Sequence, residues 1–172
     1  MTPTLSRRCP APAPRSIVMS PVPVHTLHPG DVVCAERGEQ LETLLGSCVA
    51  VILTDPRRTV GAMCHIVHAH DPSDRARSSQ AHGPVALEAM ERLLSVRGIQ
   101  SGLCEAYVFG GGNMFPDLYR ATHVGAANAD WVLRALAGRG VRVLREDLGG
   151  RFYRQVRWTV GDDPPQVRCV PV

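Results

Sequence analysis

Residues 48–70 read CVAVILTDPRRTVGAMCHIVHAH, and most of the predicted fold rests on this stretch. An apolar run over 49–53 is followed by DPRR (55–58), which has the composition of a type I turn, with Asp at its first position and Pro at its second. A second apolar run covers 59–67. Two β-rich runs joined by a short turn predict an antiparallel hairpin.

The hairpin brings a cysteine and a histidine together. With its turn centred between Pro56 and Arg57, Cys48 and His65 become direct partners across the two strands, with Cβ atoms ~4.5–5.5 Å apart. A slip of one residue would turn them to opposite faces. A histidine beside a cysteine stabilises the nucleophilic thiolate as an ion pair and can later protonate a leaving group. The hairpin therefore predicts a reactive Cys–His pair.

Residues just before Cys48 extend this prediction. The backbone N–H groups of Gly46 and Ser47 can point at a developing oxyanion, and the hydroxyl of Thr43 can hold the imidazole in one tautomer. A cysteine in an apolar strand is also an ordinary core residue. The residues alone thus leave a core thiol, a cysteine hydrolase and an acyltransferase open.

Composition excludes several other classes of protein. The chain of 172 residues has 44% hydrophobic and 20% charged residues and a net charge of +3, as expected for one globular domain. Its basic residues are all arginines, scattered along the chain, so we expect no nucleic-acid partner. It has no C-x-x-C spacing and no apolar run of about 18 residues, so we expect no membrane insertion and a cytoplasmic protein with reduced thiols.

Working outward, residues 1–23 form a proline-rich tail that we expect to be disordered, and the folded domain covers 24–172. Further strands are predicted at 32–36, 41–45, 104–109, 141–147 and 151–160, with a last edge strand at the C-terminus. Helices are predicted from Pro84 to the stop at Gly98 and over 124–137, with His123 at the start of the second. This order predicts an α/β (α+β) fold in which layered mixed β-sheets are flanked by helices.

Two other motifs were weighed as sites. CHIVHAH (64–70) is a rival metal site, but neighbouring residues of a strand point to opposite faces, so we expect no metal there. GGGN (110–113) lacks phosphate-loop spacing; we expect Gly111 to let the backbone approach the active site or substrate, and Asn113 is a candidate hydrogen-bond donor to substrate. The remaining strand cysteines, Cys34, Cys104 and Cys169, are predicted to be core residues.

Four stretches in this order resemble one known family. They are HPGD, TLLGSCVAVILTDPRRTVGAMCHIV, VFGGGNMF and VGAANADWVLRALAGRGVRVLREDLGG, and the likeness runs from about residue 24 to residue 170. They are similar to the CheD family of chemoreceptor glutamine deamidases, in which LGSCVAV followed by a histidine is the most specific motif. The resemblance implies a fold like the deamidating domain of cytotoxic necrotizing toxins.

It also implies an activity: specific glutamines of chemoreceptor cytoplasmic domains become glutamates, with release of ammonia and without a cofactor. Cys48 would be the nucleophile, His65 the general base and acid, and Thr43 the residue that orients His65. Many members bind a CheC-type phosphatase. The alternative is a non-enzymatic chemotaxis adaptor that binds such a phosphatase or the receptor; a third reading is an unrelated thiol protease or acyltransferase.

Overall fold

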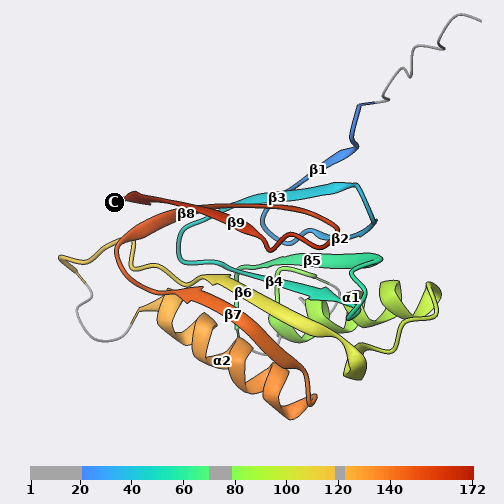
Figure 1. Cartoon of the computed structure of the whole chain (residues 1–172). Coiled ribbons are helices and arrows are strands. Elements are labelled where there is room, and N and C mark those ends of the chain that lie inside the picture. Colours follow the sequence, from blue (N-terminus) through green and yellow to red (C-terminus); the bar gives the residue numbers. More distant parts are fainter. Residues whose placement is uncertain (1–20, 70–78, 119–122) are drawn as a thin grey trace, which may run out of the picture.

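The protein has three layers in the computed structural model, which describes residues 21–69, 79–118 and 123–172 (Figure 1). Within these ranges, a four-stranded sheet lies over a five-stranded sheet, and two α-helices cover the other face of the larger sheet. Both sheets mix parallel and antiparallel pairs. The expected α+β class, with layered mixed sheets and flanking helices, is confirmed.

The upper, four-stranded sheet has the order β1-β3-β8-β9. Its strands are β1 (Val24–Leu27), β3 (Gln40–Leu45), β8 (Phe152–Thr159) and β9 (Gln166–Pro171). β1 was not predicted, because only Leu27 of its four residues is buried and no alternating pattern marks it. Cys169 on β9 is exposed, so its predicted place in the core is wrong: β9 is an edge strand that buries almost nothing.

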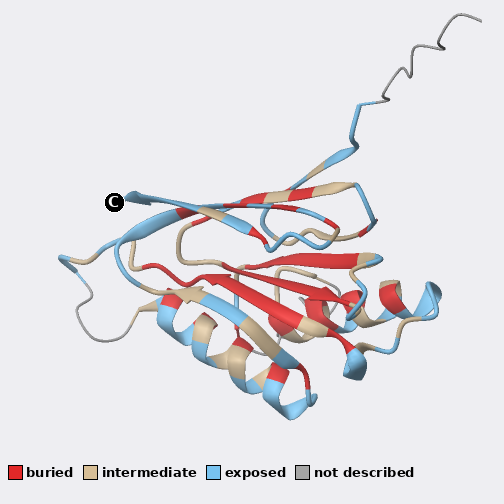
Figure 2. Cartoon of the chain, in the orientation of Figure 1, coloured by how far each residue is buried: buried red, intermediate tan, exposed pale blue. Residues whose placement is uncertain are grey.

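The central, five-stranded sheet has the order β2-β5-β4-β6-β7. Its strands are β2 (Val32–Glu36), β5 (Val60–Ile66), β4 (Val49–Thr54), β6 (Glu105–Gly110) and β7 (Arg142–Leu148). Every residue of β4 is buried, as the unbroken apolar run VAVILT requires of a strand covered on both faces (Figure 2). The site described below begins at the N-terminal end of this central strand.

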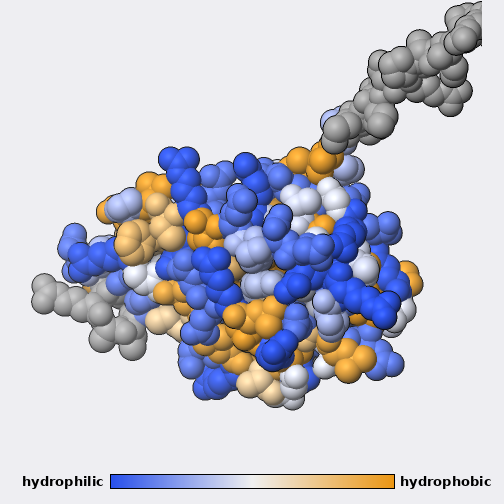
Figure 3. All heavy atoms as spheres, viewed as in Figure 1, coloured by the Kyte–Doolittle hydropathy of each residue, from blue (hydrophilic) through white to orange (hydrophobic). Residues whose placement is uncertain are grey.

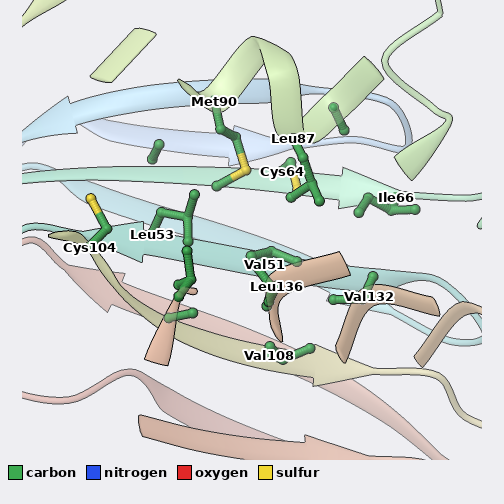
Figure 4. Packing of buried hydrophobic residues seen from close by; sticks show 14 of the residues in the cluster. Val51, Leu53, Cys64, Ile66, Leu87, Met90, Cys104, Val108, Val132 and Leu136 are labelled. Atoms are coloured by element: carbon green, nitrogen blue, oxygen red, sulfur yellow. The ribbon is translucent and has the colours of Figure 1, made fainter. Parts of the chain in front are cut away.

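Two helices close the lower face of the central sheet. α1 (Gly83–Val96) has Pro84 in its first turn, and α2 (Val124–Gly138) has His123 as its N-cap, whose ring accepts a hydrogen bond from the backbone of Ala126; both helices match the prediction. Apolar side chains pack between helices and sheet, as Figure 4 shows for Leu87, Met90, Cys64, Val51, Val108, Val132 and Leu136. A short 3₁₀ helix, η1 (Ser101–Leu103), leads into β6.

The β4–β5 hairpin forms, but not in the expected register. Ala50, rather than Cys48, lies opposite His65, so the predicted direct pairing of Cys48 with His65 is wrong by two residues. The cause is the Asp55 carboxylate, which accepts hydrogen bonds from the backbone N–H groups of Arg57, Thr59 and Val60 and lengthens the loop on the β5 side. A shift of two residues keeps every side chain on its face, and Cys48 packs against the cluster between the two sheets, on the side of the central sheet where His65 meets Thr43.

The outer surface is polar over most of the face in Figure 3, with small hydrophobic areas between the polar side chains. No helix among the described residues is long and apolar enough to span a bilayer. Most of the proline-rich tail, residues 1–20, lies outside the described residues, and so do residues 70–78.

Candidate active site

Cys48 lies where the chain passes from one sheet to the other. β3 of the upper sheet ends at Leu45, Gly46 and Ser47 make the crossing, and β4 of the central sheet begins at Val49. The crossing is tight: a Cβ at Gly46 would lie 2.8 Å from Met114 Sδ. The Cys48 side chain is half-buried and packs against the apolar cluster between the two sheets. A thiol at this crossing is therefore neither sealed in the core nor free in solvent.

Thr43 and His65 meet between the two sheets. Thr43 points inward from β3, His65 points toward it from β5, and both side chains are buried. Thr43 Oγ1 lies 2.8 Å from His65 Nδ1 and donates a hydrogen bond to the Leu27 carbonyl at 2.9 Å. A hydroxyl has one proton to donate. Because that proton goes to Leu27, the hydroxyl accepts from Nδ1–H, and the neutral ring carries its lone pair on Nε2.

His65 Nε2 has no hydrogen-bond partner among the described residues, although it is buried. Burial lowers the pKa of His65, against smaller opposing effects of the Leu27 carbonyl and the Asp31 carboxylate. Burial also raises the pKa of the Cys48 thiol. Both pKa shifts favour the uncharged forms, a thiol and an imidazole, over the thiolate–imidazolium ion pair predicted from the sequence.

Glycines bring β6 against the backbone of Cys48. Gly111 N–H donates to the Cys48 carbonyl at 2.8 Å, and Gly112 N–H donates to the Gly46 carbonyl at 2.9 Å. Gly110 has φ +115°, and a Cβ on it would lie 2.2 Å from the Cys48 carbonyl oxygen. The backbone at the end of β6 thus lies against that of Cys48, and the role predicted for Gly111 stays a prediction. A return bond from Cys48 N–H to Gly111 is not among the loop and turn bonds of the described backbone.

A cavity of about 570 Å³ adjoins the crossing on the helix side. Its lining includes two predicted site residues, Ser47 and Asn113, together with Met114, Phe115 and the first turns of α2. Asn113 Oδ1 accepts from the Phe115 backbone at 3.1 Å, which shapes this wall. Cys48 and His65 are not among the lining residues. The cavity therefore lies beside the Cys–His pair, next to Ser47, and does not contain it.

Two neighbouring residues of the rival metal motif, Cys64 and His65, point to opposite faces of the central sheet. Cys64 packs in the cluster under the helices, whereas its neighbour His65 faces the upper sheet, as the strand alternation predicted. His70, the last residue of that motif, lies outside the described residues. In the described part of the chain, no three His, Cys, Asp or Glu side chains come together in a way that could hold a metal.

One buried polar residue at the site was missed by the sequence prediction. Asn128 on α2 is 2% exposed, and its carboxamide bonds to the backbone on both sides of the Cys–His pair. An asparagine in the middle of a helix gives no signal in the sequence. Its importance appears only when the helix is packed on the sheet.

The fold and these contacts define a class: an α+β protein of layered mixed sheets, with a half-buried thiol at the crossing between the sheets and a histidine bonded to a buried hydroxyl. Comparison with known proteins narrows this class. The model of a family described as "CheD chemotactic sensory transduction" matches residues 68–167. The chain belongs to the CheD family.

Individual relatives match over most of their length. "Probable chemoreceptor glutamine deamidase CheD 2" of Albidiferax ferrireducens is 36% identical, over 79% of this chain and 81% of that protein. "Probable chemoreceptor glutamine deamidase CheD" is 32% identical in Pseudomonas fluorescens, over 85% and 84%, and 32% identical in Caulobacter vibrioides, over 88% and 80%. Among solved structures, a hypothetical protein YfiH of Bacillus licheniformis matches with TM-score 0.44 and 11% identity, over 72% of this chain and 58% of that one, which is too low to support an argument.

Proposed function

We propose that this protein is a protein-glutamine deamidase that converts glutamine side chains of chemoreceptor cytoplasmic domains to glutamate and releases ammonia. The family gives the substrate class. The observation that carries the chemistry is the Thr43–His65 hydrogen bond, which directs an unpaired Nε2 into the face that also holds Cys48. A base with a free lone pair near a thiol is what attack on a carboxamide requires.

In the proposed reaction, Cys48 Sγ attacks the side-chain carbonyl carbon of glutamine while His65 Nε2 takes the thiol proton. The carbonyl oxygen becomes an oxyanion, which we expect Cys48 N–H and the Gly46–Ser47 backbone to stabilise. His65 then gives its proton to the departing nitrogen, so ammonia leaves and a thioester remains. Water attacks the thioester with His65 again as base, and glutamate and the free thiol are formed.

A Cys48 thiol and a His65 imidazole that are both uncharged before the attack suit this reaction. Two charges buried between sheets would be costly to maintain, whereas a neutral thiol and imidazole need to separate charge only during attack. Thr43 keeps Nδ1–H occupied, which leaves Nε2 as the atom that accepts and returns the proton. No step calls for a metal or an organic cofactor.

The test uses the full chain and a purified chemoreceptor cytoplasmic fragment. We expect ammonia release and a matching conversion of amide to acid at particular glutamines in the receptor, read by mass spectrometry. An adaptor, the alternative function, would bind the fragment and leave its mass unchanged; a thiol protease would cut its backbone. Binding without any change in mass would refute the deamidase proposal.

A chemotaxis protein that acts on receptor cytoplasmic domains works in the cytoplasm, and we include this location in the proposal. Binding of a CheC-type phosphatase is a further part of it, and it rests on family resemblance alone. A pull-down with a purified CheC-type phosphatase tests this part separately, because its failure would leave the deamidase activity unaffected.

A further inference from the structure

The hairpin that carries His65 opens at the end next to Cys48. Pairing of β4 with β5 stops at Val49 and Ile66. Beyond that pair the backbone N–H groups of Val67 and His68 both turn to the Ala81 carbonyl, at 2.9 and 3.0 Å, so the chain after β5 leaves β4. The two strands therefore part as a fork just where the Cys–His pair requires a fixed separation.

The side chain of Asn128 fills this fork. Its Nδ2 donates to the Ser47 carbonyl at 3.2 Å on one branch and to the Val67 carbonyl at 2.9 Å on the other. Its Oδ1 accepts from the Ala69 N–H at 2.8 Å. Two acceptors and one donor around the group fix which end of the carboxamide is which. One buried side chain thus replaces the backbone pairing that the hairpin has lost.

Cys48 lies at the start of one branch, and His65 lies in the paired part of β5 just before the other branch begins. Ser47 is bonded to Cys48, and Val67 is two residues from His65. We propose that Asn128 is a positioning residue, which holds the Cys48 thiol and the His65 imidazole at their working separation by bonding both branches of the fork from α2. The expected change in kcat rests on the proposed function, whereas the expected change in the reactivity of the Cys48 thiol does not.

The position of Asn128 adds a link to the cavity. Asn128 and its helix neighbours Val124, Gly125 and Ala127 line the 570 Å³ cavity beside Ser47. A substrate segment seated in this cavity would therefore rest on the same helix turn that holds the fork. This arrangement places the substrate and the nucleophile against one rigid element, which favours orientation of the two for attack.

Asn128→Asp tests the proposal, because it keeps the shape and replaces the two donated bonds with repulsion between oxygens. We expect kcat for deamidation to fall about 10- to 100-fold, the range typical of a misplaced reacting group, with KM little changed. Asn128→Ala, which removes the clamp without repulsion, is the second variant if the first does not fold. We expect the same selective loss of kcat.

Thr54→Val is the matched control. Thr54 is fully buried at the other end of β4 and donates to the Val60 carbonyl at 2.8 Å, so its loss also removes a buried hydrogen bond from the hairpin. We expect Thr54→Val and the Asn128 variants all to lower the melting temperature, and only the Asn128 variants to lower kcat. Equal loss of kcat in variants of equal stability loss would overturn the positioning role.

Alkylation of Cys48 by iodoacetamide, followed by peptide mass mapping, gives a readout that needs no receptor. We expect Asn128→Asp and His65→Ala each to slow alkylation at pH 7. We expect the double variant to be no slower than His65→Ala alone, because both changes remove the help that His65 gives to the Cys48 thiol. Unchanged or faster alkylation in Asn128→Asp, or additive effects, would overturn the inference. If His65→Ala itself had no effect, the proposed Cys–His chemistry would fail as well.

Discussion

Replacing Thr43 by valine tests whether its hydroxyl sets the histidine for catalysis. Valine keeps the β-branched shape that suits β3 and exchanges the hydroxyl for a methyl group. The Thr43 hydroxyl makes two buried hydrogen bonds, to the Leu27 carbonyl and to His65 Nδ1. At about 0.5–1.5 kcal/mol for each, we expect the free energy of unfolding to fall by about 1–3 kcal/mol.

Only the bond to His65 bears on the reaction. Its loss removes about 1 kcal/mol of preference for the tautomer with a free Nε2, which lowers kcat by up to about fivefold. The assay is ammonia release from a receptor fragment under saturating substrate. ¹⁵N NMR of labelled histidine, with His65→Gln to assign the signal, reads the tautomer directly.

Thr43→Ser is the control, because it keeps the hydroxyl and loses only a methyl group. We expect it to lose stability through the missing methyl, by about 0.8 kcal/mol, while kcat stays near that of the unchanged protein. The reasoning would be refuted if Thr43→Val turned over at the original rate. It would also be refuted if the serine variant were as slow as the valine variant.

Three further predictions follow from the same geometry. Cys48→Ala should abolish ammonia release and keep the fold, whereas Cys34→Ala should keep turnover; activity without Cys48 would remove it from the mechanism. Burial lowers the pKa of His65 below its ordinary 6.5, so Nε2 stays unprotonated until the pH drops below that value. We therefore expect kcat/KM to fall only on the acid side of pH 6.5. A rate that still rises above pH 9 would instead mean that the reaction requires a preformed thiolate. Gly110→Ala should lower the denaturation midpoint and activity by more than Gly149→Ala, since both have positive φ but only at Gly110 would a Cβ meet the Cys48 carbonyl.

The side-chain face of the hairpin was predictable, and its register was not. Alternation along a strand places Cys48 and His65 on one face for any register shift of two residues, so the prediction survived an error in the turn. DPRR has the composition of a four-residue turn. The structure instead uses the Asp55 side chain to bond three amides and puts Arg58 at φ 52°, which the composition of the turn does not reveal.

The contacts of Asn128 could not be predicted from the sequence for a different reason. Helix periodicity predicted α2 and its His123 start, since apolar spacing and N-terminal residues are local signals. The partners of Asn128 lie on a crossing and on the strand end after β5, far away in the sequence. These partners need a side-chain donor because the backbone of Val67 and His68 bonds to Ala81 instead of β4. Local sequence patterns do not show where a hairpin opens in this way.

The site draws one group from each layer of the fold. Thr43 comes from the upper sheet, His65 from the central sheet and Asn128 from the helix layer, and the chain that carries Cys48 is the crossing between the two sheets. At this crossing the Cys48 thiol is half-buried, and the Cys48 carbonyl accepts from Gly111 N–H. In the proposed mechanism, the same switch of sheet thus supplies the nucleophile, and the surrounding layers supply the histidine's tautomer and its separation from sulfur.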